Sequence, residues 1–279
     1  MNSEFSIKSK GKTKNKILRY ISMKRVTKHI IVIFVLLIIG GVGNNNASNL
    51  NHTNNEHLNY EIVYHWGVIW KVAAKAELLT QTDHHQICGE LYARTQPWAD
   101  KVYRVRDTLQ TWMNPADGFM PKRYIKTAHE GKTSTIDTIE FYHCNDSIIG
   151  NSVRKRGNNI PQKHRMAAES SAYDMLSVFY YIRTLNFQEM TPGDEIITTI
   201  FSGRRKEWLK IRYIGDETIK LRDKQQRQSH HLTLTFSMKN QQNSSAPIDA
   251  WLDIDNSHKP LLIRGTLNVG EIRVYYTGN

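Results

Sequence analysis

Residues 171–185, SAYDMLSVFYYIRTL, form the strongest helical pattern in a chain that otherwise alternates between apolar and polar residues. Ser170 or Ser171 is a suitable N-cap, and Asp174 lies in the first turn, where a carboxylate is favoured. One face is apolar at helical spacing, with Met175, Val178, Phe179 and Ile182. A second flank is also largely apolar, with Leu176, Tyr180 and Arg183. One helix that is covered on several sides, beside many strands, predicts a sheet that curls around it.

Period-two alternation, punctuated by turns, covers most of the sequence on either side of this segment. Turn residues stand at Gly67, Asn114–Gly118, Asn145–Asp146 and Gly203. The pattern predicts a mainly β (α+β) fold with a largely antiparallel sheet of ten or more strands. The expected strands are Tyr60–Tyr64, Val68–Leu79, Ile87–Thr95, Thr108–Met113, Pro121–His129, Asp137–Cys144, Ile148–Arg156, Ile196–Ser202, Glu207–Ile214, Glu217–Leu221, Ser229–Lys239, Ile248–Ile254, Pro260–Leu267 and Glu271–Tyr276.

A second helix is expected near Trp98. Trp98, Val102 and Val105 fall at helical spacing, and the spacing continues to Trp112. The strong turn at Asn114–Gly118 indicates that the residues just before it already form a strand. We therefore expect this helix to end near Arg104.

The first 47 residues have the order of an export signal. Nine lysines and arginines precede the uncharged stretch Ile30–Gly43, and small residues follow. These fourteen residues are fewer than the roughly twenty that cross a bilayer as a helix. We predict a signal peptide over residues 1–47, with cleavage after Ala47 and Met23 as a second candidate start. The alternative is an uncleaved segment that tethers the chain to the inner membrane.

The predicted leader also carries most of the net charge. The whole chain has a formal charge of +12, and removal of residues 1–47 leaves +4. The best remaining basic cluster, Arg204–Lys206, follows a turn glycine without a nucleic-acid recognition motif. We therefore expect an exported, periplasmic protein that does not bind nucleic acid. Residues 48–57 are polar and predict a flexible lead-in, and residues 58–279 predict one β-rich domain.

Two cysteines, Cys88 and Cys144, are candidates for one disulfide in an oxidising compartment. The alternative is a pair of small buried or half-buried thiols. A metal site is not expected, because the adjacent His84 and His85 would point to opposite faces of a strand. No cofactor motif is present either.

Enzymatic patterns are weak. No Gly-x-Ser-x-Gly elbow occurs, and His129–Glu130 lacks the His-Glu-x-x-His spacing of a helical metal site. Asp253 and Asp255 could share one strand face and serve glycosidic or cation chemistry. A solvated strand end is the alternative for this pair. We expect a protein that is not an enzyme.

Several short patterns resemble a family of exported bacterial proteins, the domain of unknown function 3108 family. The resemblance runs from about Tyr60 to Tyr276. Its residues, in chain order, are Pro121, Tyr124, Asp174, Leu176, Ser177, Tyr180, Arg183, Gly203, Arg204, Trp251, Asp253, Asp255, Pro260 and Gly270. The resemblance implies the fold of the LolA/LolB-like lipoprotein carriers, an antiparallel sheet curled into an incomplete barrel around one or two helices.

Such a half-barrel would enclose an apolar cavity for an acyl chain or a similar ligand. The candidate lining is aromatic: Trp66, Trp70, Tyr92, Trp98, Tyr103, Trp112, Phe179, Tyr180, Phe201 and Trp208. The alternative is that these aromatic side chains fill an ordinary core.

Two functions follow from these alternatives. The first is a non-enzymatic periplasmic module that binds a lipid or another amphiphile between the curved sheet and the 171–185 helix. The second is an envelope structural or protein-interaction module with a solid core and no ligand. The oligomeric state, the ligand and the partner do not follow from the sequence.

Overall fold

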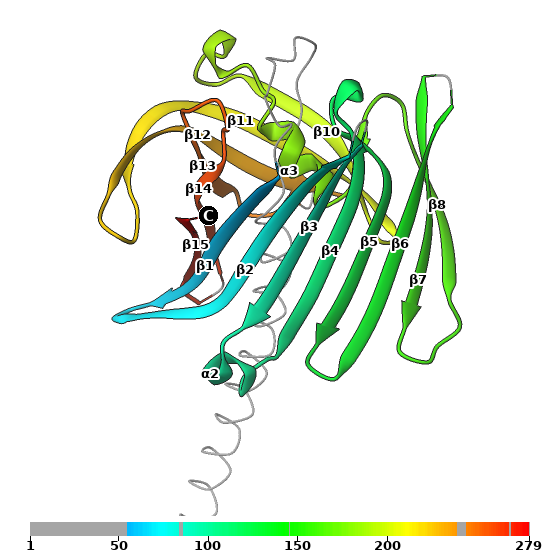
Figure 1. Ribbon diagram of the computed structural model, residues 1–279, viewed down its shortest axis with the longest axis horizontal. Helices are drawn as coiled ribbons and strands as arrows, with labels where there is room; N and C mark the ends of the chain where they lie inside the picture. Colours follow the sequence, from blue (N-terminus) through cyan, green and yellow to red (C-terminus); the bar gives the residue numbers. More distant parts are fainter. Residues whose placement is uncertain (1–54, 84–85, 145, 239–243, 268, 279) are drawn as a thin grey trace, which may run out of the picture.

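The computed structural model describes residues 55–83, 86–144, 146–238, 244–267 and 269–278. They form one sheet of fifteen strands that bends into a nearly closed barrel (Figure 1). The spatial order is β8-β7-β6-β5-β4-β3-β2-β1-β15-β14-β13-β12-β11-β10-β9. The predicted leader lies outside the described residues. No helix in the described part of the chain is long and apolar enough to span a membrane.

Two antiparallel meanders, β1–β8 and β10–β15, make up the sheet, and β1 joins them by pairing with β15. Only the two-residue β9 runs parallel to its neighbour, β10. The strands are β1 (Glu56–Trp66), β2 (Ile69–Asp83), β3 (Gln86–Thr95), β4 (Val105–Asn114), β5 (Met120–Glu130), β6 (Thr133–Cys144), β7 (Ser147–Arg156), β8 (Gln162–Ala168), β9 (Ala172–Tyr173), β10 (Glu195–Ser202), β11 (Arg205–Lys220), β12 (Gln226–Ser237), β13 (Ile248–Asp253), β14 (Pro260–Thr266) and β15 (Glu271–Gly278).

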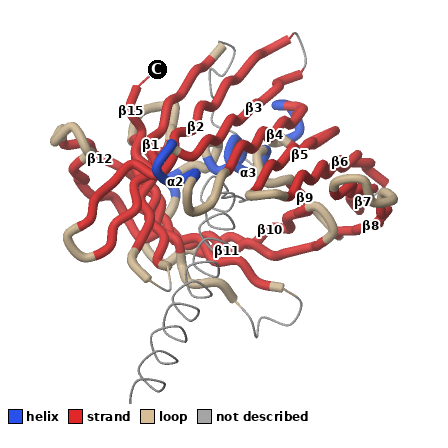
Figure 2. Tube along the Cα trace, turned by 90° about the horizontal axis from the view of Figure 1, so that it is seen from below, coloured by secondary structure: helices blue, strands red, loops and turns tan. Residues whose placement is uncertain are grey.

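The helical elements are short: α2 (Pro97–Asp100), α3 (Ser177–Ile182) and the 3-10 turns η1 (Pro115–Asp117) and η2 (Phe187–Glu189). α3 lies inside the ring of strands, and all six of its residues are buried (Figure 2). Consecutive antiparallel strands place alternate loops at the same end of a sheet. We call the end with α2 and the β1–β2, β5–β6 and β7–β8 loops the α2 end. The opposite end, where the chain enters α3, is the α3 end.

The barrel closes through side chains and not through a continuous ladder. β8 and the β10–β11 hairpin face each other across the seam, where the Lys206 ammonium donates to the Ala167 carbonyl (2.9 Å). Arg204 donates to the Gln162 side chain (3.3 Å), and the Ser152 hydroxyl donates to the Gly203 carbonyl. The expected mainly β, antiparallel, barrel-like sheet is therefore confirmed.

The helix expected over residues 171–185 is wrong in extent. Ala172 and Tyr173 form β9 beside β10, so the helix cannot begin at Ser170 or Ser171. The buried Asp174 turns the chain instead, because its Oδ1 accepts hydrogen bonds from the backbone N–H groups of Leu176 (2.7 Å) and Ser177 (2.9 Å). Only one and a half turns of helix follow.

Other boundaries also shift. The second helix is confined to the four residues of α2, and the next strand begins at Val105. The strands expected at 207–214 and 217–221 are one long strand, β11, with an irregularity at Gly215. Glu56 and His57 belong to β1 and not to a lead-in. Strand β8 is not predicted from the sequence, because most of its residues are polar and show no alternation between apolar and polar side chains.

Candidate functional site

A polar cavity of about 740 Å³ occupies the half of the barrel nearest the α2 end. It lies between β5, β6 and β7 on one side and the β10–β11 hairpin on the other, and the β7–β8 loop contributes to its rim. The lining residues are Tyr103, Tyr124, Lys126, Glu130, Thr133, Thr135, Asp137, Arg154, Arg156, Asn159, Ile160, Gln162, Met175, Ser202, Gly203, Arg204, Arg205 and Glu207. A cavity of this size can hold a small organic ligand.

The strands that line the cavity change character along their inner faces. On β6, Ile139 and Phe141 point into the apolar core near the α3 end, whereas Asp137 and Thr135 on the same face point into the cavity. Inward-facing positions alternate along a strand, so this change needs no irregularity. The barrel interior is therefore apolar in its α3 half and polar in its α2 half.

Ion pairs order the charged groups on the β5–β7 wall. The Lys126 ammonium lies 3.6 Å from Asp107 and 3.6 Å from Glu130, and Arg154 lies 3.4 Å from Asp137. Burial raises the pKa of Asp107 to about 6, although Lys126 opposes this shift. Burial also raises the pKa of Asp137, against the influence of Arg154. These acids are therefore easier to protonate than acids in water.

Some buried polar atoms around the cavity lack a hydrogen-bond partner within the described residues. In this part of the chain the Tyr124 hydroxyl has no partner, whereas Asp107 Oδ2 and Asp137 Oδ1 have only their ion pairs with Lys126 and Arg154 at 3.6 and 3.4 Å. Tyr124 is almost fully buried, and burial raises the pKa of its hydroxyl well above the usual value, so the group stays a neutral donor. Unpartnered buried polar groups are rare because they cost free energy. Here they mark a place where a polar ligand could bind.

Phe201 belongs to the apolar core and directly precedes Ser202 and Gly203, which line the polar cavity. Its ring is fully buried and stacks on Phe141 with 5.7 Å between centroids. It also lies against the backbone of Gly150, where an added Cβ would stand 2.5 Å from the ring. The next residue but one, Gly203, has φ of +59°, and a Cβ there would come within 3.2 Å of the Asp137 carboxylate. Glycine is therefore needed at both positions for this packing.

The buried Asp107 gives a pH-dependent prediction. Its folded pKa of about 6 lies above the usual value of about 4, so the stability that this group contributes falls as pH rises from 4 to 6. Asp107→Asn keeps the shape without the charge. We expect the variant to gain about 2–3 kcal/mol of unfolding free energy relative to the wild type between pH 4 and pH 7.

Urea unfolding at a series of pH values measures this difference. Asp255→Asn is a control of opposite sign. Burial raises the pKa of Asp255, but hydrogen bonds from Ser257 and Lys259 outweigh burial and lower it overall. That variant should lose stability relative to the wild type as pH rises. A constant difference between Asp107→Asn and the wild type would contradict the assigned burial.

The structure does not bring the ten expected aromatic residues together. Phe179, Tyr180 and Phe201 are buried inside the barrel, and Tyr103 lines the polar cavity. Trp66 and Trp70 are half exposed at the tip of the β1–β2 hairpin. Three others, Tyr92, Trp112 and Trp208, alternate with buried neighbours and so lie on the outer face of their strands, and Trp98 lies in α2.

The apolar space inside the barrel is small. Phe179 lines a cavity of about 20 Å³ together with Tyr60, Ile62, Ala76, Leu78, Leu91, Pro260, Ile263 and Val274. This volume holds about one water molecule. An acyl chain therefore does not fit beside α3 in this conformation, and the room for a ligand lies in the polar cavity.

Sequence reasoning missed most residues of the polar cavity. Lys126, Glu130, Asp137 and Arg154 alternate with partly apolar neighbours, and the usual interpretation places charged residues outside. One signal was present: Asp137 shares a strand face with Ile139 and Phe141, as a buried acid would.

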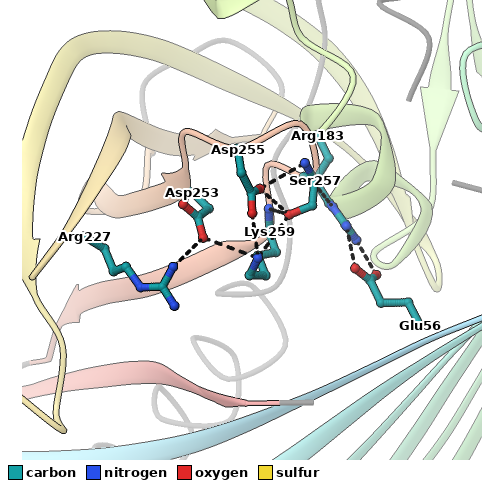
Figure 3. Close-up of polar contacts among 7 residues, drawn as sticks. All are labelled: Glu56, Arg183, Arg227, Asp253, Asp255, Ser257 and Lys259. Carbon is teal, nitrogen blue, oxygen red and sulfur yellow. Dashed lines mark hydrogen bonds and ion pairs between the residues drawn. The ribbon is translucent and has the colours of Figure 1, made fainter. Parts of the chain in front are cut away.

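A second polar cluster lies at the α3 end, where strand β13 ends (Figure 3). Lys259 lies 3.3 Å from Asp253 and 2.9 Å from Asp255, and Arg227 lies 3.6 Å from Asp253. Asp255 also accepts a hydrogen bond from the Ser257 backbone N–H (3.0 Å). The two acids are thus not a free pair on one strand face. They neutralise cations and cap a turn.

The two cysteines carry free thiols in the structure. Cys88 lies on β3 and Cys144 ends β6, so β4 and β5 separate them. Neighbouring strands are about 4.8 Å apart, and a disulfide requires Cα atoms within about 7 Å. The sheet therefore does not permit a bridge between them within one chain.

The expectation about a metal site concerns two adjacent histidines. His84 and His85 lie outside the described residues. Among the residues that the structure describes, no group of three or more His, Cys, Asp and Glu side chains could hold a metal ion.

Residues 59–277 match the family described as "Protein of unknown function (DUF3108)". The chain belongs to the DUF3108 family. The resemblance drawn from the sequence motifs is confirmed. No curated protein matches this DUF3108 chain.

The motif residues of the DUF3108 chain are mainly structural. Asp174 caps α3 and accepts a hydrogen bond from Thr111 (2.6 Å). Tyr180 shares a hydrogen bond with Thr80 (2.9 Å), and Arg183 is fully buried against Glu56. Tyr124 and Arg204 are different, because both line the polar cavity.

Two solved structures are similar to this DUF3108 chain to different degrees, both at low identity. A beta-barrel-like protein of the domain of unknown function DUF1849 from Brucella abortus is similar with a TM-score of 0.52 and 9% identity. The match covers 79% of this chain and 95% of that one. A "putative lipoprotein" from Parabacteroides distasonis gives a TM-score of 0.30 and 6% identity, over 83% and 98% of the two chains. The first comparison supports the barrel-like fold, and the second carries no further weight.

Proposed function

We propose that this chain is a non-enzymatic binding protein of the bacterial cell envelope whose polar cavity takes an anionic ligand. The observation that carries this proposal is the cavity of about 740 Å³, whose wall holds a buried Tyr124 hydroxyl without a hydrogen-bond partner among the described residues. The envelope location rests on the export-signal pattern of residues 1–47. The likeness to lipoprotein carriers stays part of the proposal, with the binding site moved from the apolar core to the polar half of the barrel.

The charge of the lining favours an anion. Lys126 and four arginines face three acids, Glu130, Asp137 and Glu207. Burial raises the pKa of Asp137 and of Glu207, which favours their neutral forms. Lys126 and Arg154 are held by acids of the wall, whereas the described residues place no acid within 4.0 Å of the Arg156, Arg204 or Arg205 side chains. Guanidinium groups bind phosphate and carboxylate in two-point geometry.

The lining favours binding over catalysis. It contains neither cysteine nor histidine, so its hydroxyl groups have no imidazole beside them to act as a general base. Four of the charged groups in the wall form ion pairs, Lys126 with Glu130 and Arg154 with Asp137. Such a site can hold and orient a ligand without a nucleophile.

An anionic group could come from a soluble phosphate ester or from the head group of a lipid. A lipid would enter the polar half head first, because the apolar cavity near α3 holds only about 20 Å³. Both ligands would present the same chemistry to Arg156 and Arg204. The experiment below separates them.

The test measures the shift in melting temperature of the mature chain with three probes: glucose 6-phosphate, glucose and dihexanoylphosphatidylglycerol. We expect the phosphate compounds to raise the melting temperature and glucose to have little effect. Arg156→Glu/Arg204→Glu should weaken the effective probe at least about tenfold. Arg165→Glu, a charge reversal at an exposed position of β8, is the matched control and should bind like the wild type.

A response to glucose 6-phosphate assigns a soluble ligand, and a response to the short-chain lipid alone assigns a head group. No response to either anion, or an equal response in the double variant, would contradict the proposal. That outcome would favour the second function, a structural or protein-interaction module. The filled apolar core is the observation in its favour.

A further inference from the structure

The tip of the β1–β2 hairpin displays apolar side chains to solvent. Residues 66–70 read WGVIW. Val68 is 98% exposed, Trp66 54%, Trp70 50% and Ile69 44%. Single exposed apolar residues are common, but a contiguous group of this size on a soluble surface usually marks an interaction site.

This tip is an ordered part of the sheet. β1 and β2 pair up to Trp66 and Ile69, and Gly67 has the positive φ that the turn requires. The His65 ring stacks on the Trp70 ring with 3.8 Å between centroids. The Arg273 guanidinium also lies over the Trp70 ring, 4.8 Å from its centroid. The Trp70 ring is therefore held in place at the tip, and the neighbouring apolar side chains are exposed.

Basic residues surround the same end of the molecule. Alternate loops of an antiparallel meander meet at one end, so the β1–β2 tip shares the α2 end with α2 and the β5–β6 and β7–β8 loops (Figure 1). The β10–β11 turn lies beside this end, where Arg204 contacts Gln162 at the start of β8. The exposed cations of these segments that lie at this end are Lys71, Lys101, Arg104, Lys132, Arg156, Arg204 and Arg205. The acids there, Asp100 and Glu130, are only partly exposed and each is paired with a base.

The α3 end has the opposite charge. Its described loops expose Asp117, Asp146, Glu169, Glu189, Asp194 and Asp255. Within these loops, the described residues include no exposed lysine or arginine, although exposed cations lie next to them at Lys122, near the start of β5, and at Arg222 and Lys224 in the β11–β12 turn. The barrel is therefore polarised, with a basic, tryptophan-bearing end and an acidic end.

We propose that the α2 end docks on an anionic lipid bilayer, with the 66–70 tip inserted at the membrane interface. Tryptophan is favoured at this interface because its ring is apolar and its N–H is polar. The basic loops would lie against anionic head groups. The polarity of the barrel selects this end, since the acidic α3 end would be repelled. This docking does not rest on the ligand of the cavity, although Arg156 and Arg204 at the cavity rim would then face the lipid surface.

Sedimentation with vesicles tests the docking. The mature chain should bind vesicles of equal parts phosphatidylethanolamine and phosphatidylglycerol. It should bind phosphatidylcholine vesicles at least about tenfold more weakly, and added salt should weaken the binding. Val68→Asp/Ile69→Asp should lower binding to the anionic vesicles at least about tenfold, because two inserted apolar side chains become charged.

Ile197→Asp is the matched control, since Ile197 is 57% exposed on β10, away from the tip, and should bind like the wild type. The tip variant should keep the wild-type melting temperature and the wild-type response to glucose 6-phosphate, which separates loss of docking from loss of the cavity site. Equal vesicle binding by the tip variant and the wild type would overturn the proposal. If the tip variant bound vesicles like the wild type but no longer captured an envelope protein that the wild type captures, the tip would be assigned to a protein partner, and the proposal would also be overturned.

Discussion

Arg183→Met should lower the free energy of unfolding by about 3–5 kcal/mol, the expected cost of breaking a buried ion pair. The Arg183 side chain is fully buried, and its two terminal nitrogens each donate to the Glu56 carboxylate at 2.8 Å (Figure 3). Its Nε donates to the Ser257 carbonyl, also at 2.8 Å. Burial lowers the pKa of Arg183, but the partner carboxylate outweighs burial and raises it overall. The guanidinium therefore ties α3 to β1 and to the turn before β14.

Urea unfolding measures this cost, and Arg222→Met is the matched control. Arg222 also pairs with a glutamate of β1, Glu61, but its side chain is 44% exposed. Exposed ion pairs contribute about 0–1 kcal/mol. Equal unfolding free energies for the two variants would show that the Arg183 pair is not a buried link.

Phe201→Ala should lower the free energy of unfolding by about 3–5 kcal/mol, because removal of a fully buried ring leaves a cavity in the apolar core. The packing of the ring against Gly150 gives a sharper test. In the wild type, Gly150→Ala should destabilise the protein by about 1–3 kcal/mol, since the new Cβ meets the ring at 2.5 Å. In the Phe201→Ala background the same change should be close to neutral.

A double-mutant cycle in urea measures the coupling between these two positions. Tyr142→Ala, at a 49% exposed aromatic residue of β6, is the control for Phe201→Ala and should cost far less. Additive effects of Gly150→Ala and Phe201→Ala would contradict the observed contact.

Most strands could be predicted from the sequence, because alternation and turn residues are local signals. The turn at Asn114–Gly118 and the hairpin at Gly203 occur where they were expected. The helix was overestimated because its apolar residues also suit a buried, irregular segment. Pairing of Ala172 and Tyr173 with β10 is a contact between distant strands, and it overrides local helical spacing.

The candidate site was harder to predict than the fold. On β5, one face carries Tyr124, Lys126 and Glu130, and the other carries Ile125 and His129, so neither face is clearly apolar. Only barrel closure decides which face is inside. Large aromatic residues such as Trp112 were expected to line the interior, but Trp112 lies on the outer face of the sheet, where Arg123 lies over its ring.

The central claim is that the ligand space lies in the polar half of the barrel and not in the apolar half. A crystal structure of the mature chain with glucose 6-phosphate, or with dihexanoylphosphatidylglycerol, tests it most directly. We expect the phosphate group between Arg156 and Arg204, with the remainder of the ligand toward the Tyr124 hydroxyl. A ligand bound beside Phe179 and Leu78, with the polar cavity collapsed, would contradict the account.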